Sequence, residues 1–190
     1  MASCGPGVIR RLEPLFNAKG AHALDAPGLS RPLDAPGKSL IVMVGGDKHI
    51  FDSLIPMFEA FADKVVYTGG LGTANICKVV HNMTTVAMQQ VVAEGLTLGV
   101  KAGVDLETLL ESGSRGPIGA SEERLTPTVF KNIYDPPVFT LDLARKDIGL
   151  ATKLGRESGV PLPVANLVEQ IMMQAMNRGW GDSDRTIAVT

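Results

Sequence analysis

The pattern of apolar and polar residues divides the chain into two parts. Before residue 70, segments with a helical period alternate with short, continuous apolar runs that are typical of buried strands. Such alternation predicts an α/β layer with parallel or mixed strands. A stretch rich in Pro and Gly, 28–38, predicts a loop. The predicted elements are a helix over 7–18, a short strand ending at Asp25, a strand over 39–46, a helix over 47–62 with Asp47 as N-cap, and a strand over 64–69.

After residue 72 the strand signals nearly stop. Apolar residues keep a period of roughly 3.6 from Ile76 to about Ala102, which predicts an unusually long helix that Gly103 can end. Cys77, in the first turns of this helix, is expected to be buried in the hydrophobic core. Shorter helices are predicted after Asp105, which acts as N-cap, through Leu110, over 140–158 and over 163–178. The segment 112–137 mixes loop and short helix. The sequence therefore predicts an α/β domain over 1–70 and an all-helical domain over 71–190.

Composition narrows the function classes. The formal net charge is −2, without a cluster of Lys and Arg, which argues against a nucleic-acid surface. The two cysteines, Cys4 and Cys77, are far apart, so a disulfide framework or a cysteine metal site is not expected. No apolar run reaches membrane-spanning length, and the N-terminus lacks a secretory apolar segment. We expect a cytoplasmic protein, or a mitochondrial one if the native N-terminus lies upstream.

The segment "GLGTANICKVVHNM" (70–83) allows two interpretations. Gly70 and Gly72 match the first two glycines of a dinucleotide-binding turn, but Asn75 stands where the third small residue belongs, and the following helix is too long for such a unit. In the other interpretation, Lys78 and Asn82 lie four residues apart on one helical face, as a general acid or base and a substrate-orienting amide. Spacing alone does not separate this pair from a solvent-facing Lys and Asn.

Several motifs in order along the chain resemble those of the β-hydroxyacid dehydrogenase family, which includes 3-hydroxyisobutyrate dehydrogenase and tartronate semialdehyde reductase. The pattern Gly69-x-x-Gly72-x-x-x-x-x-Lys78-x-x-x-Asn82 is similar to the family signature. The similarity continues in "GAHALDAP", in "SLIVMVGGDKHIFDSLIPMFEAFADKVVYTGGLG", in "FTLDLARKDIGLATKLGRESGVPLP" and in "GWGDSDRTIAV", which resembles the family's final helix. The resemblance implies a Rossmann-type domain, of which residues 1–70 are the C-terminal remnant, followed by a helical domain.

The resemblance also implies a function and a site. It implies an oxidoreductase that transfers a hydride between NAD or NADP and a small β-hydroxy acid or its semialdehyde. Lys78 would be the catalytic acid or base, and Asn82 and Gly72 would contact the substrate. Lys146 and the adjacent Asp147 would contact the cofactor near its nicotinamide end. Without the resemblance, these last two would be interpreted as a solvent-facing pair on a helix.

Two departures from the family pattern stand out. No G-x-G-x-x-G turn precedes residue 70, and "MASCGPGV" resembles a later family segment, with Ser3 at a position that contacts cofactor and Cys4 replacing Thr. We therefore expect this chain alone to bind NAD(P) poorly. The substrate loop also differs, because Ser30 and Arg31 stand in place of the usual V-S-G-G. Arg31 could bind a substrate carboxylate or could be an ordinary surface residue.

Other functions stay open at this stage. The run "KVVHN" also resembles 6-phosphogluconate dehydrogenase, but that enzyme needs an acid where this chain has Thr85. His81 is then a packed or hydrogen-bonded neighbour of Lys78. A non-catalytic helical oligomerisation module derived from the family is the alternative to an enzyme. Gly95 and Gly99 in the long helix would allow close packing in a homodimer.

Overall fold

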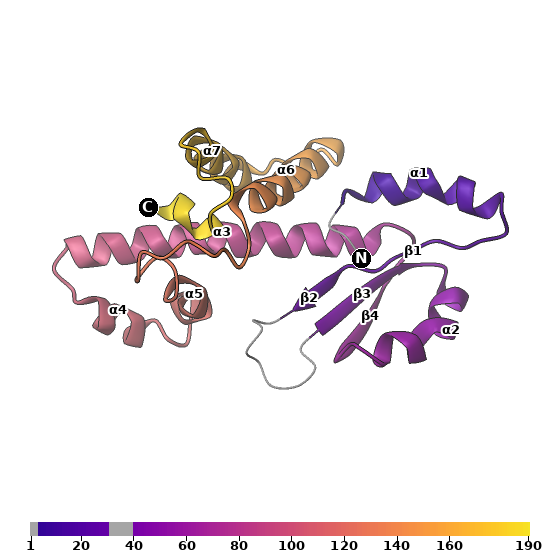
Figure 1. Ribbon diagram of the computed structural model, residues 1–190, viewed down its shortest axis with the longest axis horizontal. Helices are drawn as coiled ribbons and strands as arrows, with labels where there is room; N and C mark the ends of the chain where they lie inside the picture. Colours follow the sequence, from indigo (N-terminus) through magenta and orange to yellow (C-terminus); the bar gives the residue numbers. More distant parts are fainter. Residues whose placement is uncertain (1–3, 31–39) are drawn as a thin grey trace. The chain divides into compact units, whose positions relative to one another are not determined.

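The computed structural model describes residues 4–30 and 40–190. The chain forms two compact units, one ending at His81 and the other comprising Asn82–Thr190, and each is considered by itself. The boundary falls inside the long helix α3 (Thr73–Lys101). Helices and a small sheet make up the first unit, and helices alone make up the second (Figure 1). The predicted fold class, a remnant of an α/β domain followed by an all-α domain, is confirmed.

The sheet of the first unit is built around β3 (Leu40–Gly46). Strand β4 (Lys64–Gly69) pairs with β3 in parallel, whereas β1 (Leu24–Asp25) and β2 (Gly28–Ser30) pair with β3 antiparallel. The expectation of parallel or mixed strands is therefore confirmed as a mixed sheet. The continuous apolar run of β3 is buried from Val42 onward, as its sequence predicted.

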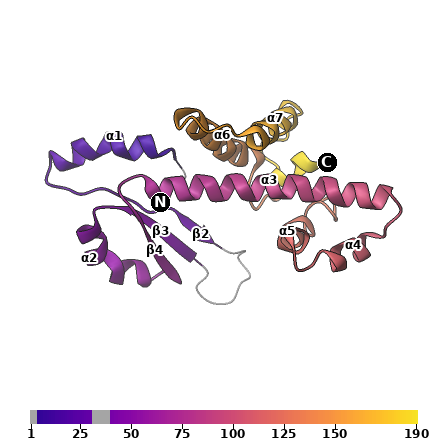
Figure 2. The same cartoon turned by 180° about the vertical axis from the view of Figure 1, so that it is seen from behind.

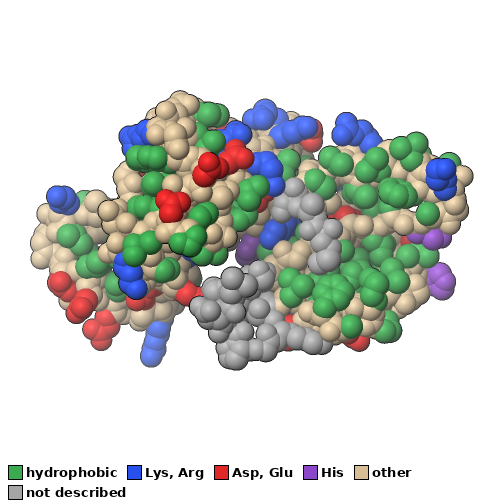
Figure 3. All heavy atoms as spheres, viewed as in Figure 1, with side chains coloured by type: hydrophobic (Ala, Val, Ile, Leu, Met, Phe, Trp, Pro, Cys, Tyr) green, Lys and Arg blue, Asp and Glu red, His purple; other side chains and the backbone are tan. Residues whose placement is uncertain are grey.

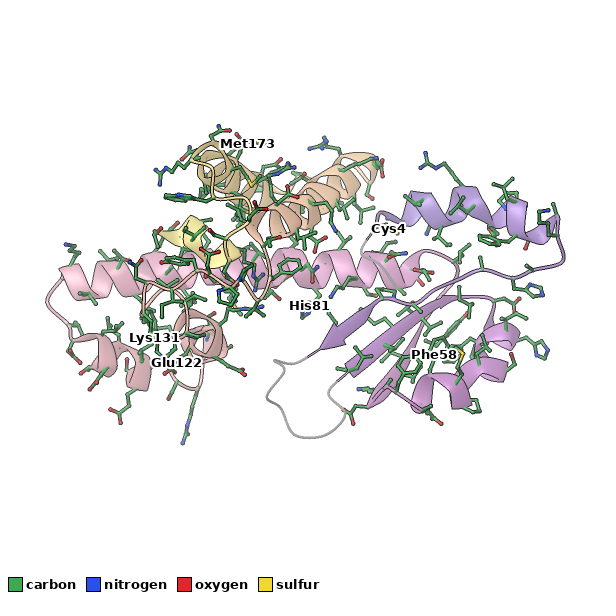
Figure 4. All side chains as sticks on the ribbon, viewed as in Figure 1. Cys4, Phe58, His81, Glu122, Lys131 and Met173 are labelled. Atoms are coloured by element: carbon green, nitrogen blue, oxygen red, sulfur yellow. The ribbon has the colours of Figure 1, made fainter. Side chains whose placement is uncertain are left out.

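Helix α2 (Lys48–Glu59) covers the sheet. It begins where predicted, because the carboxylate of Asp47 accepts hydrogen bonds from the N–H groups of His49 at 2.8 Å and Ile50 at 3.0 Å. Phe58 extends from α2 toward the strands in Figure 4 and is buried in the same apolar cluster as Val42 and Val44. This cluster is the hydrophobic core of the first unit.

Helix α1 (Pro6–Asn17) carries an apolar stripe that stays at the surface. Figure 3 shows hydrophobic side chains exposed along it, and the exposed ones are Val8, Leu12, Leu15 and Phe16. The helix occupies the predicted segment.

The loop predicted over 28–38 is wrong at its beginning, because Gly28–Ser30 forms β2. Gly28 lies opposite Val42, and a Cβ atom there would come within 2.7 Å of the Leu40 side chain. The glycine that signalled a loop therefore allows close approach of a neighbouring strand. Residues 31–38 lie outside the described residues.

The second unit contains two apolar clusters. Helices α6 (Leu141–Glu157) and α7 (Pro163–Asn177) lie side by side and pack on α3, with Val86, Ile148 and Val168 in the cluster (Figures 1 and 2). A second cluster joins α3 to the short helices α4 (Leu106–Ser112) and α5 (Pro117–Leu125). Asp105 caps α4 as predicted. The final segment, expected as a helix, forms a short 3-10 helix, η1 (Arg185–Val189).

Two predictions for α3 need correction. Cys77 is exposed, because Ala74, Asn75 and Val79 make the buried contacts of the first turns and Cys77 lies on another side of the helix. The predicted apolar stripe also does not stay buried along the whole helix. Val91 and Leu98 are exposed, and the buried positions there are Val92, Ala93 and Leu96.

Candidate active site

The chain enters α3 through a glycine turn whose backbone conformation explains its sequence. Gly69 and Gly72 have positive φ angles, +114° and +91°, which side chains rarely adopt. A Cβ atom at Gly72 would also lie 3.2 Å from the carbonyl oxygen of Pro6 and 2.9 Å from Nε of Arg10. The turn is thus packed directly against the start of α1.

A buried carboxylate closes the N-terminal end of α3. Oδ1 of Asp25 accepts a hydrogen bond from the N–H of Gly72 at 2.6 Å, and Oδ2 accepts one from the N–H of Asn75 at 2.8 Å. These are the N–H groups that a phosphate would need, and the carboxylate places a negative charge where the phosphate would lie. The phosphate interpretation of this turn is therefore excluded.

Cys4 lies next to the same turn. Its sulfur is 3.7 Å from Oδ1 of Asn75, and Figure 4 shows its side chain beside the first turns of α3. Arg10 Nε donates a hydrogen bond of 2.8 Å to the carbonyl oxygen of Leu71. These contacts hold α1 to the turn and fix the position of the first residues of α3.

Lys78 follows in the second turn of α3 and is half-buried. Its Nζ donates a hydrogen bond of 2.9 Å to the carbonyl oxygen of Gly28 in β2. A carbonyl oxygen stabilises the ammonium group by a charge-assisted hydrogen bond and anchors the end of a flexible side chain. The structure thus holds the proposed catalytic nitrogen against the sheet of its own unit.

In the second unit, the half-buried Asn82 and the buried Asp147 form a polar pair. Nδ2 of Asn82 donates a hydrogen bond of 2.6 Å to Oδ2 of Asp147, whose side chain is only 3% exposed. Nζ of Lys146 lies 3.3 Å from the other oxygen, Oδ1, as an ion pair without hydrogen-bond geometry. The structure therefore brings together three of the predicted site residues and fixes the plane of the Asn82 amide.

For the other predicted site residues, the structure gives a backbone position or no description. The N–H of Gly72 is bound to Asp25, so that a substrate contact by this residue stays a prediction. The backbone of Ser30 lies in β2 opposite Leu40. Ser3 and Arg31 lie outside the described residues. Their roles toward cofactor and substrate also stay predictions.

Three charged residues with marked environments were not singled out from the sequence. The sequence predicted Asp25 as the end of a strand and as part of a family motif, but an acid at the end of an apolar strand is also a signal for a capping or binding role. Asp184 and Arg185 lie in the final segment and are both buried. Burial, together with the positive charge of Arg124, lowers the pKa of Arg185 to about 10.

Metal chemistry and membrane insertion find no support in the described part of the chain. Within residues 4–30 and 40–190, no group of three or more His, Cys, Asp or Glu side chains could hold a metal ion. Over the same residues, no helix combines the length and the apolar character needed to cross a bilayer.

Two family models match consecutive parts of the chain. Residues 72–190 match the NAD-binding family of NADP-dependent 3-hydroxyisobutyrate dehydrogenase, and residues 1–69 match the NAD-binding domain of 6-phosphogluconate dehydrogenase. The first match covers more than half of the chain. The similarity to 6-phosphogluconate dehydrogenase thus concerns the α/β part.

Individual relatives point to the same family. The chain is 28% identical over its whole length to 2-(hydroxymethyl)glutarate dehydrogenase of Eubacterium barkeri and spans 63% of that protein. It is 30% identical to glyoxylate/succinic semialdehyde reductase 1 of Arabidopsis thaliana, with 92% of this chain matched to 60% of the relative. The crystal structure of 3-hydroxyisobutyrate dehydrogenase from Salmonella typhimurium has the same fold, with a TM-score of 0.85 at 22% identity over 98% of this chain and 66% of that one. The chain therefore belongs to the β-hydroxyacid dehydrogenase family of NAD(P)-dependent oxidoreductases.

Proposed function

We propose that this chain takes part in hydride transfer between NAD or NADP and a small β-hydroxy acid or its semialdehyde, with Lys78 as general acid and base. The observation that supports this most directly is the anchored ammonium group of Lys78, 2.9 Å from the carbonyl oxygen of Gly28. A lysine held in one place can meet a substrate hydroxyl without first losing the freedom of its side chain. An unanchored surface lysine would lack this advantage.

The roles follow from the chemistry of each side chain. When bound, NAD(P) accepts a hydride from the alcohol carbon or returns it to the carbonyl carbon. Lys78 takes the hydroxyl proton in oxidation and donates it in reduction, and a positive charge beside the oxygen stabilises the alkoxide that develops. Asn82, four residues later in α3, orients the substrate, and Asp147 fixes the amide of Asn82.

The described residues fit only one end of the cofactor. Lys146 is half-exposed, with its ammonium group beside Asp147, and could contact the nicotinamide end. The glycine turn before α3 is closed by Asp25 and offers no place for the pyrophosphate. We therefore propose that this chain alone binds NAD(P) weakly. Cofactor contacts by Asp147 and Ser3 belong to the same proposal.

The test compares Lys78→Ala with the wild-type chain in the reduction of glyoxylate, succinic semialdehyde and 2-hydroxy-3-oxopropionate. NADH or NADPH is raised until the rate no longer increases, so that weak cofactor binding does not hide turnover. Loss of a general acid should lower kcat by about 100-fold or more with little change in KM. Lys131→Ala, which removes an exposed lysine, is the matched control. Equal turnover by Lys78→Ala and wild type would contradict the role of Lys78. Tight binding of NADH or NADPH in calorimetry would contradict the proposal of weak binding.

One surface favours a second candidate, a homodimerising helical module without turnover. Val91 and Leu98 of α3 are 60% and 71% exposed, and a Cβ atom at the intervening Gly95 would meet no atom within 4 Å. Such a face suits close packing against the same helix of a second copy. Gly99 does not belong to this face, because the space that a side chain there would fill is taken by Leu109 of the same chain.

Solution scattering and light scattering test this second candidate. Leu98→Glu should convert a dimer to a monomer, whereas Val138→Glu, a change at another exposed apolar residue, should not. A monomeric wild-type chain would contradict the proposed dimer. A dimer with no turnover on any of the three substrates would favour the module over the enzyme.

A further inference from the structure

The second unit contains a cavity next to the C-terminal end of α3. Its volume is about 230 Å³, and residues of α3, α4, α5 and η1 contribute to its walls. All but two of the side chains that line it are apolar, among them Leu96, Leu125 and Phe130. Leu96 and Leu125 are buried in the cluster that joins α3 to α4 and α5. The wall is therefore part of a packed core and keeps its shape.

Two polar side chains, Thr97 and Lys101, also line the cavity. They lie four residues apart and thus on one face of α3, and both residues are exposed. The hydroxyl of Thr97 donates a hydrogen bond of 2.8 Å to the carbonyl oxygen of Ala93. Lys101 therefore supplies the hydrogen-bond donors at the edge of the cavity.

The ammonium group of Lys101 is available to a ligand. Lys101 is the last residue of α3, and the final carbonyl oxygens of the helix accept hydrogen bonds from the N–H groups of Gly103 and Val104. These bonds partly neutralise the negative end of the helix without the lysine. In the part of the chain that the structure describes, no acid lies within ion-pair distance of Lys101. None of the residues that line the cavity is acidic either.

We propose that this cavity binds a monocarboxylic acid whose aliphatic chain has about seven carbon atoms beyond the carboxylate. An apolar protein cavity of about 150 Å³ holds one benzene molecule, so that about 230 Å³ holds roughly nine carbon atoms at the same density. The chain lies against Leu96, Leu125 and Phe130, and the carboxylate stays at the edge beside Lys101. An apolar tail and one negative charge match an apolar wall and one cation.

This site is separate from the proposed catalytic residues. Asn82 and Lys101 lie about 28 Å apart along α3, at about 1.5 Å per residue. A molecule in the cavity is therefore out of reach of a substrate that Asn82 orients. The inference goes beyond the proposed function and does not depend on catalysis by Lys78.

The test is a calorimetric titration of the 190-residue chain with hexanoate, octanoate and dodecanoate, each below its micelle-forming concentration. Octanoate should bind in a one-to-one ratio and about tenfold more tightly than hexanoate, because two further methylene groups are buried. Dodecanoate should bind no more tightly than octanoate, because its additional carbon atoms exceed the cavity. Octylammonium, an aliphatic chain with the opposite charge, should bind about tenfold more weakly than octanoate.

Two variants close the cavity and keep the cation. Ala93→Leu fills it from a buried lining position, and Val100→Trp covers its edge from a lining position that is 45% exposed. Each should weaken octanoate binding by about tenfold or more. Because Val100 is exposed, the larger side chain does not disturb the packed core, and loss of binding by Val100→Trp is not a loss of folding.

A third variant tests the charge. Lys101→Met should weaken octanoate binding by about threefold and should remove the difference between octanoate and octylammonium. Lys153→Met, which removes an exposed lysine of α6, is the matched control and should change neither.

Four results would overturn the proposal. The first is the absence of saturable octanoate binding by the wild-type chain. The second is a steady gain in affinity from octanoate to dodecanoate, because open apolar surfaces such as Val91 and Leu98 would then be the binding site. The third is undiminished binding by Val100→Trp, and the fourth is equal affinity of the wild-type chain for octanoate and octylammonium.

Discussion

The carboxylate of Asp25 caps the distant helix α3 through a hydrogen bond of 2.6 Å from the N–H of Gly72, which lies 47 residues later in the chain. A second bond, from the N–H of Asn75, satisfies another donor of the same helix end. The end of β1 and the beginning of α3 are thereby joined, and Lys78 follows one turn after Asn75. The position of the proposed catalytic nitrogen therefore depends on a residue that does not contact it.

Asp25→Asn should destabilise the first unit. The amide replaces one acceptor oxygen with a donor, which would face a backbone N–H and leave it unsatisfied inside the protein. We expect the free energy of unfolding to fall by about 2 kcal/mol, as measured by urea denaturation. Asp52→Asn is the control, because Asp52 pairs with Lys48 at the exposed surface. An equal effect of both changes would show that Asp25 is not an important cap.

Gly72→Ala tests the turn itself. The positive φ angle and the short distance to the Pro6 carbonyl oxygen should together cost about 2 kcal/mol of unfolding free energy. Gly70→Ala is a close control, because a Cβ atom there would meet nothing within 4 Å and its φ is not positive. Thermal unfolding of the two variants should therefore differ by several degrees. Similar melting temperatures would mean that the turn tolerates side chains.

The sequence predicted most of the elements but not the contacts that connect them. Asp47 and Asp105 cap the helices that directly follow them, and such local rules could be applied along the chain. Asp25 caps a helix that is distant in sequence, so that no local rule links it to Gly72. The strand β2 was missed for a similar reason, because the fit of Gly28 against Leu40 depends on which strand lies beside it.

Contacts between residues distant in sequence were also missing from the prediction of the candidate site. Family motifs identified Lys78, Asn82 and Lys146, and the side-chain partners of these residues came only from the fold. The Asn82–Asp147 bond spans 65 residues, and the cation at Arg185 becomes notable only through its burial. A charged residue in a sequence is unremarkable until packing removes water from it.

Asn82→Asp should destabilise the second unit in a pH-dependent way. The change places two carboxylates within hydrogen-bond distance, where both cannot stay ionised at low cost. We expect a loss of about 3 kcal/mol at pH 7, measured by urea denaturation. Stability should recover on acidification, because a proton shared between the two carboxylates removes their repulsion. Gln174→Glu, which adds the same charge at an exposed position of α7, should show neither effect.

Asp184 should give the opposite pH dependence of stability, with a loss on acidification. Burial by itself would raise the pKa of its carboxyl group, but the donors from Thr186, Phe139 and Val138 outweigh burial and hold the pKa below its usual 3.8. Because the folded-state pKa is the lower one, the stabilisation is fully present above about pH 4 and is lost as the pH falls through the folded-state pKa. Wild-type stability should therefore decline on acidification below pH 4.

Asp184→Asn, which should cost about 3 kcal/mol at neutral pH, should show less of this decline. Asp182→Asn removes the same charge at an exposed neighbouring position and should leave both the stability and its pH dependence unchanged. A pH profile of Asp184→Asn parallel to that of wild type would show that the hydrogen bonds to this side chain do not depend on the ionised carboxylate.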